Sequence, residues 1–165
     1  MKILIRVVLI AALAALGAWL WTVLHPGPEK IIRSRLVEVA RNASFTGQEG
    51  NFARVTASQN LSDSFTTDGQ VVVDFPGVEA LAIEGRDQVF RLSMYARSQV
   101  KAAKVEFLDF DVALGPDMKA AQVELTAKVF VPWEKGFVPL ELKFSLKQLD
   151  GVWLITRVES VKVLN

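Results

Sequence analysis

The chain has 165 residues, a formal net charge of +1 and no cysteine. Lys2 and Arg6 belong to the N-terminal segment, which leaves 17 basic and 18 acidic residues for the remainder, without a concentrated basic stretch. This composition argues against nucleic-acid binding, because displacing phosphate counterions requires a basic face. The absence of cysteine excludes disulfides, thiolate nucleophiles and cysteine zinc sites.

The N-terminal segment is predicted to be a membrane anchor. Residues 3–24 contain one charged side chain, Arg6, and are long enough for a single spanning helix, which His25-Pro26-Gly27-Pro28 would end. Basic residues precede the apolar run and none cluster directly after it, which predicts a cytoplasmic N-terminus. We therefore expect a single-pass membrane protein, with an anchor and linker over residues 1–27 and a periplasmic or otherwise extracytoplasmic domain over residues 28–165.

This segment has two other interpretations, a cleaved signal peptide and a buried core helix. A cleaved signal peptide would use the basic start, the apolar middle and the small residues Ala15 and Gly17 before a cleavage site at Ala18. Cleavage there would leave the apolar residues 18–24 at the mature terminus, so the anchor is favoured and secretion after cleavage is the alternative. A buried core helix is disfavoured because the segment lacks a polar face.

Three helices are predicted in the first half of the domain. Apolar residues recur at helical spacing over residues 29–44 and, more weakly, over residues 52–65. Thr67-Asp68-Gly69 is interpreted as a turn, followed by a short strand at residues 71–73. The third helix, over residues 85–100, has Asp87 in its first turn, where the helix dipole favours an anion.

From residue 104 onward the apolar period falls from about 3.6 to about 2, which predicts four antiparallel strands with one buried face. Turns are expected at Gly115-Pro116-Asp117, at Glu134-Lys135-Gly136 and at Asp150-Gly151, the last being a favoured two-residue hairpin. The side chains expected on the buried face are Leu108, Phe110, Val112, Leu114, Val123, Leu125, Ala127, Val129, Val131, Val138, Leu140, Leu142, Phe144 and Leu146. The fold class is α+β, with three helices packed on a curved antiparallel sheet and one transmembrane helix before them.

This order of elements resembles the nuclear transport factor 2-like superfamily over about residues 29–164. The similarity rests on residues 61–74 as the passage from helix to first strand, on Glu84-Gly85-Arg86-Asp87 as the entry to the third helix, and on residues 150–158 as the last strand. The superfamily includes SnoaL-like polyketide cyclases, ketosteroid isomerases and many members without catalytic activity. The resemblance implies a cystatin-like, cone-shaped sheet curled around a pocket.

Catalytic members of that superfamily need an Asp or His base facing the cone and a Tyr, Asp or His that stabilises an enolate-like oxygen. The single histidine, His25, lies beside the apolar segment, and the single tyrosine is Tyr95. Asp63, Asp74 and Tyr95 are the candidates for a catalytic set. Asp63 is more simply a helix-surface charge and Asp74 a turn residue, so a non-enzymatic role is favoured over an enzyme.

Acidic residues gather at Glu106, Asp109 and Asp111, where a calcium ion is conceivable. Calcium sites draw about six or more oxygen ligands from a flexible loop, which a regular strand does not offer. A solvated strand face, balanced by Lys128 or Lys143 on neighbouring strands, explains the cluster better. We expect neither a metal nor a cofactor.

Trp133, Tyr95 and Trp153 are the candidate residues for ligand or partner binding. Indole rings supply a large contact area and one polar group. Core packing is the simpler explanation for Trp153, whereas Trp133 lies in a predicted turn and is the better candidate for a contact.

The sequence therefore predicts a membrane-anchored, extracytoplasmic, non-enzymatic module for interaction or small-ligand binding. Its layout resembles the single-span assembly components of type IV secretion systems and other anchored members of the superfamily. The expected partners are the membrane, a second copy of the chain or a membrane protein, and a small apolar ligand. The alternative is a small-molecule isomerase or lyase that acts in the cone, an idea that rests on the fold alone.

Overall fold

The structure is a computed structural model that describes residues 11–17, 19–20, 26–74 and 80–161. The chain divides into two compact units, Met1–Ile31 and Ile32–Asn165. In the first unit, residues 11–17 and 19–20 are helical. No helix formed by the described residues combines the length and the apolarity needed to cross a membrane. Much of the predicted anchor at residues 3–24 lies outside the described residues, so the anchor stays a prediction.

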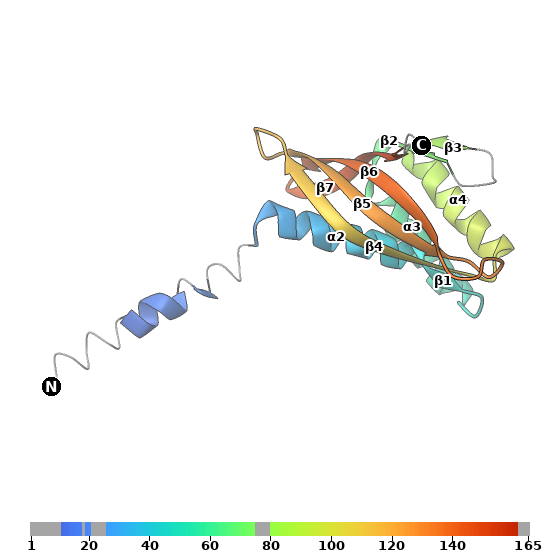
Figure 1. Cartoon of the computed structure of the whole chain (residues 1–165), viewed down its shortest axis with the longest axis horizontal. Helices are drawn as coiled ribbons and strands as arrows, with labels where there is room; N and C mark the ends of the chain where they lie inside the picture. Colours follow the sequence, from blue (N-terminus) through green and yellow to red (C-terminus); the bar gives the residue numbers. More distant parts are fainter. Residues whose placement is uncertain (1–10, 18, 21–25, 75–79, 162–165) are drawn as a thin grey trace. The chain divides into compact units, whose positions relative to one another are not determined.

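The secondary structure is that of an α+β domain (Figure 1). The three helices and four long strands predicted from periodicity are confirmed, with small differences at their ends. In chain order, the elements are α2 (Pro28–Ala43), β1 (Phe45–Thr46), α3 (Asn51–Ser62), β2 (Phe65–Val73), β3 (Leu81–Glu84), α4 (Arg86–Gln99), β4 (Ala102–Leu114), β5 (Ala120–Phe130), β6 (Val138–Leu149) and β7 (Val152–Ser160).

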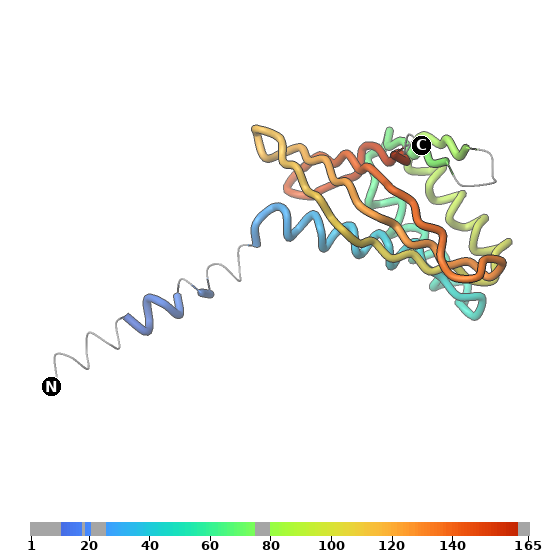
Figure 2. Tube along the Cα trace, in the orientation of Figure 1, coloured from blue at the N-terminus to red at the C-terminus, as the bar shows by residue number. Residues whose placement is uncertain are grey.

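The strands form one sheet of seven strands in the order β1-β4-β5-β6-β7-β2-β3. The long strands β4, β5 and β6 run side by side and twist together along their length (Figure 2). The predicted purely antiparallel sheet is wrong in one place, because β2 pairs with β7 in parallel. Alternation of apolar residues marks a buried strand face but carries no information on the direction of the neighbouring strand.

The segment after α3 differs most from the sequence-based expectation. Thr67-Asp68-Gly69 is not a turn but part of β2, which starts at Phe65 and has an irregular register with β7 before Gln70. The strands β1 and β3 were not predicted. The first part of β2, β1 and β3 form strands because they pair with residues elsewhere in the chain. A local turn-forming residue such as Gly69 does not prevent this pairing.

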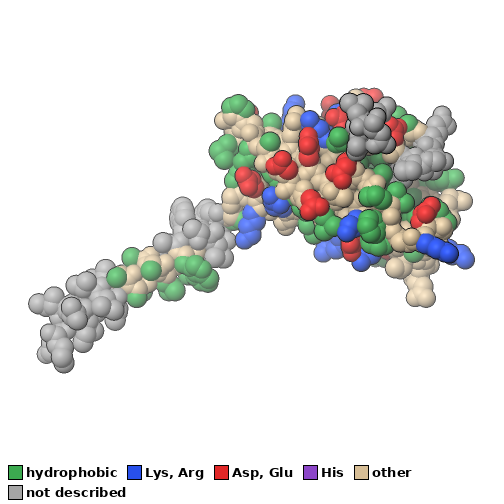
Figure 3. Space-filling view, in the orientation of Figure 1, with side chains coloured by type: hydrophobic (Ala, Val, Ile, Leu, Met, Phe, Trp, Pro, Cys, Tyr) green, Lys and Arg blue, Asp and Glu red, His purple; other side chains and the backbone are tan. Residues whose placement is uncertain are grey.

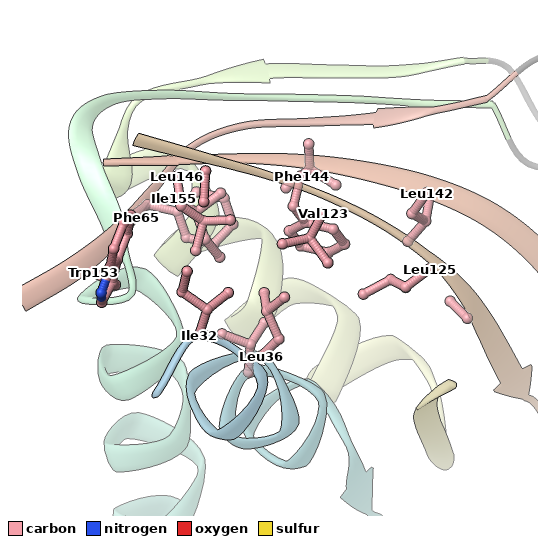
Figure 4. Packing of buried hydrophobic residues seen from close by; sticks show 14 of the residues in the cluster. Ile32, Leu36, Phe65, Val123, Leu125, Leu142, Phe144, Leu146, Trp153 and Ile155 are labelled. Atoms are coloured by element: carbon pink, nitrogen blue, oxygen red, sulfur yellow. The ribbon is translucent and has the colours of Figure 1, made fainter. Parts of the chain in front are cut away.

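The core lies between α2 and the inner face of the sheet. Ile32 and Leu36 are fully buried and pack toward apolar side chains of β5, β6 and β7 (Figure 4). Burial of each such aliphatic side chain contributes roughly 1.5–3 kcal/mol to folding. The alternation predicted for β5 and β6 is confirmed, since the buried side chains are Val123, Leu125, Ala127, Leu140, Leu142, Phe144 and Leu146.

A β-bulge in β4 changes which side chains of that strand face the core. The register with β5 shifts between Leu108 and Asp111, and Asp109 has a φ of 53°, a left-handed conformation that Asp tolerates better than most residues. Before the bulge Phe107 packs against the core, with its ring 5.5 Å from that of Phe144. The sequence-based assignment of Leu108 to the buried face is therefore wrong, because the extra residue inverts the alternation.

The outer face of the sheet is polar. Acidic side chains are interspersed with basic and uncharged ones over this face (Figure 3). Thr126 Oγ1 donates to Glu141 Oε1 over 3.0 Å, and Lys143 Nζ lies 3.8 Å from Glu124 Oε1 on the neighbouring strand. Such pairs are typical of a solvated strand face, and a homodimer formed through this face would have to bury them.

Candidate functional site

Apolar side chains form the core against the inner face of the curved sheet. The buried polar side chains among the described residues are Ser58, Ser62, Ser64, Thr66 and Arg97. No buried carboxylate is found among the described residues, and the single histidine, His25, lies outside them. A general base has to reach the reacting atoms, so the described part of the interior holds no group for that role.

The three residues considered for catalysis lie at the surface and do not form a common site. Asp63 caps the end of α3, accepts a hydrogen bond from Gln59 and lies 3.6 Å from the Arg86 guanidinium. Tyr95 is exposed on α4, about 14 Å further along the helix than Arg86 at 1.5 Å per residue. Asp74 follows β2, where its backbone N–H donates to Ser160 Oγ.

One concavity with an apolar lining is an open recess at one end of the sheet, here named the rim recess. It has a volume of about 480 Å³, within the range of about 300–1,000 Å³ that is usual for ligand pockets. It lies where the α2–β1 junction meets the start of β4 and the end of β5. Its apolar lining comes from Phe45, Ala102, Ala103, Phe130, Val131 and Pro132, and its polar lining from Ser44, Thr46, Glu49 and Lys104.

A buried arginine holds one wall of the rim recess in place. The side chain of Arg97 on α4 is 2% exposed, and its Nη1 lies 2.6 Å from Glu49 Oε2. Its Nη2 donates to the backbone carbonyls of Asn42 and Ser44, at the C-terminal end of α2, where a cation also complements the helix dipole. The guanidinium lies 5.1 Å from the ring centroid of Phe45, a cation–π contact. Arg97 therefore contacts three residues that line the recess, Ser44, Phe45 and Glu49.

Ser44 makes the junction between α2 and the sheet. Its hydroxyl donates to the Ala40 carbonyl over 2.8 Å, and it accepts the Val105 N–H over 2.9 Å. Beside it, Gly47 approaches the backbone of Lys101 so closely that a Cβ atom would lie 2.7 Å from the Lys101 carbonyl oxygen. Glycine is required at this position because any side chain would displace the backbone that borders the recess.

The β5–β6 hairpin carries exposed aromatic side chains beside the rim recess. Trp133 is 66% exposed and Phe137 is 45% exposed, and the Phe137 ring packs against Phe130 at 5.7 Å. Lys104 lies 5.5 Å from the Phe130 ring and Lys128 lies 4.6 Å from the Phe137 ring, so both lysines are held over aromatic faces. Phe137 thus contacts the recess residue Phe130, and the predicted contact residue Trp133 directly follows the recess residue Pro132 in the chain.

The other residues considered for binding have different places. Trp153 is buried in the core at 2% exposure, and its indole N–H has no acceptor within the described structure. Glu106 pairs with Lys104 over 2.6 Å, and Asp109 forms the β4 bulge while Asp111 follows it. Within the described ranges, no group of three or more His, Cys, Asp or Glu side chains is placed to bind a metal.

Sequence reasoning did not find Arg97, Phe45 or the rim recess. Arg97 lies beside the apolar stripe of α4 and has the sequence appearance of an exposed charge. Its burial depends on Glu49 and on the carbonyl groups at the end of α2, which are about 50 residues away in the chain. The one local indication was the aromatic and proline content of the β5–β6 turn, which predicts Trp133 as a contact residue; the structure shows that its side chain is exposed.

No known family profile matches the sequence, and no curated protein matches it. Solved structures do match. A domain of unknown function with a cystatin-like fold from Nostoc punctiforme is similar with a TM-score of 0.62 and 14% identity, over 86% of this chain and 80% of that one. A nuclear transport factor 2-like protein with a cystatin-like fold from Novosphingobium aromaticivorans matches with a TM-score of 0.60 and 15% identity, over 90% of this chain and 88% of that chain.

An uncharacterised protein with a cystatin-like fold from Caulobacter vibrioides gives a TM-score of 0.61 at 15% identity, over 82% of this chain and 89% of that chain. At these identities the similarity establishes the fold and nothing about activity. The expected nuclear transport factor 2-like, cystatin-like fold is therefore confirmed, with the mixed seven-stranded sheet described above.

Proposed function

We propose that the chain is a membrane-anchored, extracytoplasmic interaction module that binds a protein partner through the rim recess and the adjacent β5–β6 hairpin. One observation carries the proposal. The interior is packed with apolar side chains, whereas an open aromatic concavity lies at the edge of the sheet and is flanked by exposed Trp133 and Phe137. The anchor and the export rest on the sequence of residues 2–24.

A protein partner fits this surface better than a small molecule does. Small-ligand pockets enclose about 70–90% of their ligand, which an open recess cannot do. Protein interfaces are enriched in exposed Trp, Tyr and Phe, and a few such residues beside a pocket dominate the binding energy. Trp133 and Phe137 next to the recess match that description.

The charges at the recess are already paired, which indicates what the partner offers. Glu49 is neutralised by Arg97, and Lys104 by Glu106, at 2.6 Å in each case. An additional charge from a partner would find no free counterpart among these groups and would lose its hydration. We infer that the partner inserts an aliphatic or aromatic side chain and surrounds it with polar contacts.

The test compares matched aromatic variants of the full chain in native membranes. Phe137→Ala and Trp133→Ala remove the hairpin aromatics, while Phe52→Ala removes an 85% exposed aromatic on α3 and serves as the control. A partner recovered by crosslinking with the unchanged chain and with Phe52→Ala should be lost with both hairpin variants. With the purified partner, each hairpin variant should weaken the affinity by about 30-fold, the loss of a 2 kcal/mol contact.

Three results would contradict the proposal. Equal recovery of the partner by Phe52→Ala and by the hairpin variants would place the interface elsewhere. Co-purification of an organic molecule that Phe137→Ala loses would identify the small apolar ligand instead. Recovery of only a second copy of the chain would identify the homodimer that the superfamily resemblance suggested. An isomerase or lyase gains no support from the described residues, since Asp63, Asp74 and Tyr95 are dispersed at the surface.

A further inference from the structure

Two hairpin turns at the end of the sheet opposite the rim recess expose apolar side chains side by side. Met118 in the β4–β5 turn is 53% exposed, and Leu149 and Val152 beside the β6–β7 turn are 48% and 49% exposed. The two turns are joined by a hydrogen bond of 2.7 Å from the Gln148 N–H to the Lys119 carbonyl. We name Met118, Leu149 and Val152 the tip patch.

The antiparallel course of β5 fixes the tip patch and the rim recess at opposite ends of the sheet. Ala120 starts β5 next to the tip patch, and Phe130 ends it in the recess. At about 3.4 Å per residue, the strand separates the two surfaces by about 35 Å. Helix α2 runs antiparallel to β4, because Ser44 at its C-terminal end bonds Val105 whereas Arg33 near its start lies over Phe110.

Ile32 and Arg33, where the second unit begins, therefore lie toward the end of the sheet that carries the tip patch. The predicted spanning segment ends at Leu24, and the second unit begins at Ile32. A chain extends at most about 3.6 Å per residue, so residues 25–31 allow at most about 29 Å between these two residues. The linker formed by residues 25–31 is therefore short. It joins the domain at the end of the sheet that carries the tip patch, not at the end that carries the rim recess.

We infer that the tip patch rests on the bilayer from which the anchor emerges, so that the rim recess faces away from the membrane. This inference depends on the anchor in the proposed function. Apolar side chains on adjacent turns can enter the interfacial region to a depth of about 5–10 Å. In this orientation the rim recess cannot reach a partner that is embedded in the bilayer. It is open to a partner that approaches from the aqueous extracytoplasmic side.

The charges around the tip patch indicate which lipids it needs. In and beside the two turns, Lys119 and Lys147 equal Asp117 and Asp150 in number, so these residues together carry no net charge to attract anionic headgroups. The Asp117 carboxylate is also occupied, since its Oδ1 accepts the Lys119 N–H over 3.0 Å. The contact is therefore apolar, and it should form on zwitterionic membranes and persist at high salt.

The absence of cysteine allows a direct test on the full chain. Met118→Cys and Val152→Cys place an environment-sensitive fluorophore in the tip patch, and Lys135→Cys places it in the β5–β6 turn at the opposite end. Each labelled chain is reconstituted in phosphatidylcholine vesicles that contain a lipid with a quencher near the headgroup. Because that quencher acts near the interface, we expect at least about threefold stronger quenching at residues 118 and 152 than at residue 135, at low and at high salt.

Retention of each chain on the vesicles in alkaline carbonate is measured in parallel and separates two kinds of failure. Release of the chain would overturn the anchor and this inference with it. Retention with weak or equal quenching at all three sites would overturn the inference alone and leave the anchored module intact. Quenching at residues 118 and 152 that disappears at high salt would overturn the apolar contact. Two independent tip positions guard against one label that disturbs its turn.

Discussion

Replacing the buried Arg97 with methionine should destabilise the domain more than the same replacement of an exposed arginine. The change keeps much of the side-chain length but removes the donor to Glu49 and to the carbonyls of Asn42 and Ser44. Breaking a buried ion pair from one side costs about 3–5 kcal/mol. The Glu49 side chain is 22% exposed, so water can solvate the unpaired carboxylate and reduce that cost. We expect a loss of about 2–4 kcal/mol in the free energy of unfolding.

The assay is urea unfolding of the full chain in detergent micelles, followed by the far-ultraviolet circular dichroism of the sheet. Arg91→Met is the matched control, because Arg91 is an exposed arginine on the same helix and should cost no more than about 0.5 kcal/mol. A double-mutant cycle with Glu49→Gln should give a coupling energy within about 0.5–3 kcal/mol. If Arg97→Met lowered the free energy of unfolding no more than Arg91→Met does, the conclusion that Arg97 holds the wall of the rim recess in place would be refuted.

Two further pairs of exchanges test the backbone features. Gly47→Ala should cost about 1–3 kcal/mol and weaken partner binding, because its Cβ would lie 2.7 Å from the Lys101 carbonyl oxygen. Gly50→Ala, at the N-cap of α3 with no atom within 4 Å, should cost less than about 1 kcal/mol in the same unfolding assay and leave partner binding unchanged. Phe107→Ser should cost about 3–5 kcal/mol and Leu108→Ser less than about 1 kcal/mol, and the reverse order would show that β4 has no bulge at Asp109.

The packed interior and the two exposed surfaces occupy different parts of the domain. Side chains of α2, such as Ile32 and Leu36, occupy the space between helix and sheet, which makes the core itself unavailable to a ligand. The two proposed contact surfaces lie at the ends of the sheet, where strands stop and turns expose Trp133 at one end and Met118 at the other. The length of the strands keeps these two surfaces apart.

The sequence by itself determined which segments are helical, which faces of β5 and β6 are buried and where the hairpins between the long strands turn. These features follow from residues close together in the chain, such as the period-2 alternation of β5 and β6 and the Asp150-Gly151 pair. Both residues of that pair adopt the positive φ that their hairpin requires, 50° and 80°. The charged N-terminal start and the apolar run after it likewise suffice to predict an anchor, a prediction that the described residues leave open.

Only the tertiary structure decided the features that join distant residues. The parallel pairing of β2 with β7, the strand at Thr67-Asp68-Gly69 and the burial of Arg97 each depend on partners far along the chain. The bulge at Asp109 adds one residue and reverses the alternation that periodicity would continue. The rim recess has the same origin, because four segments that are unremarkable alone form a concave surface only when the sheet brings their ends together.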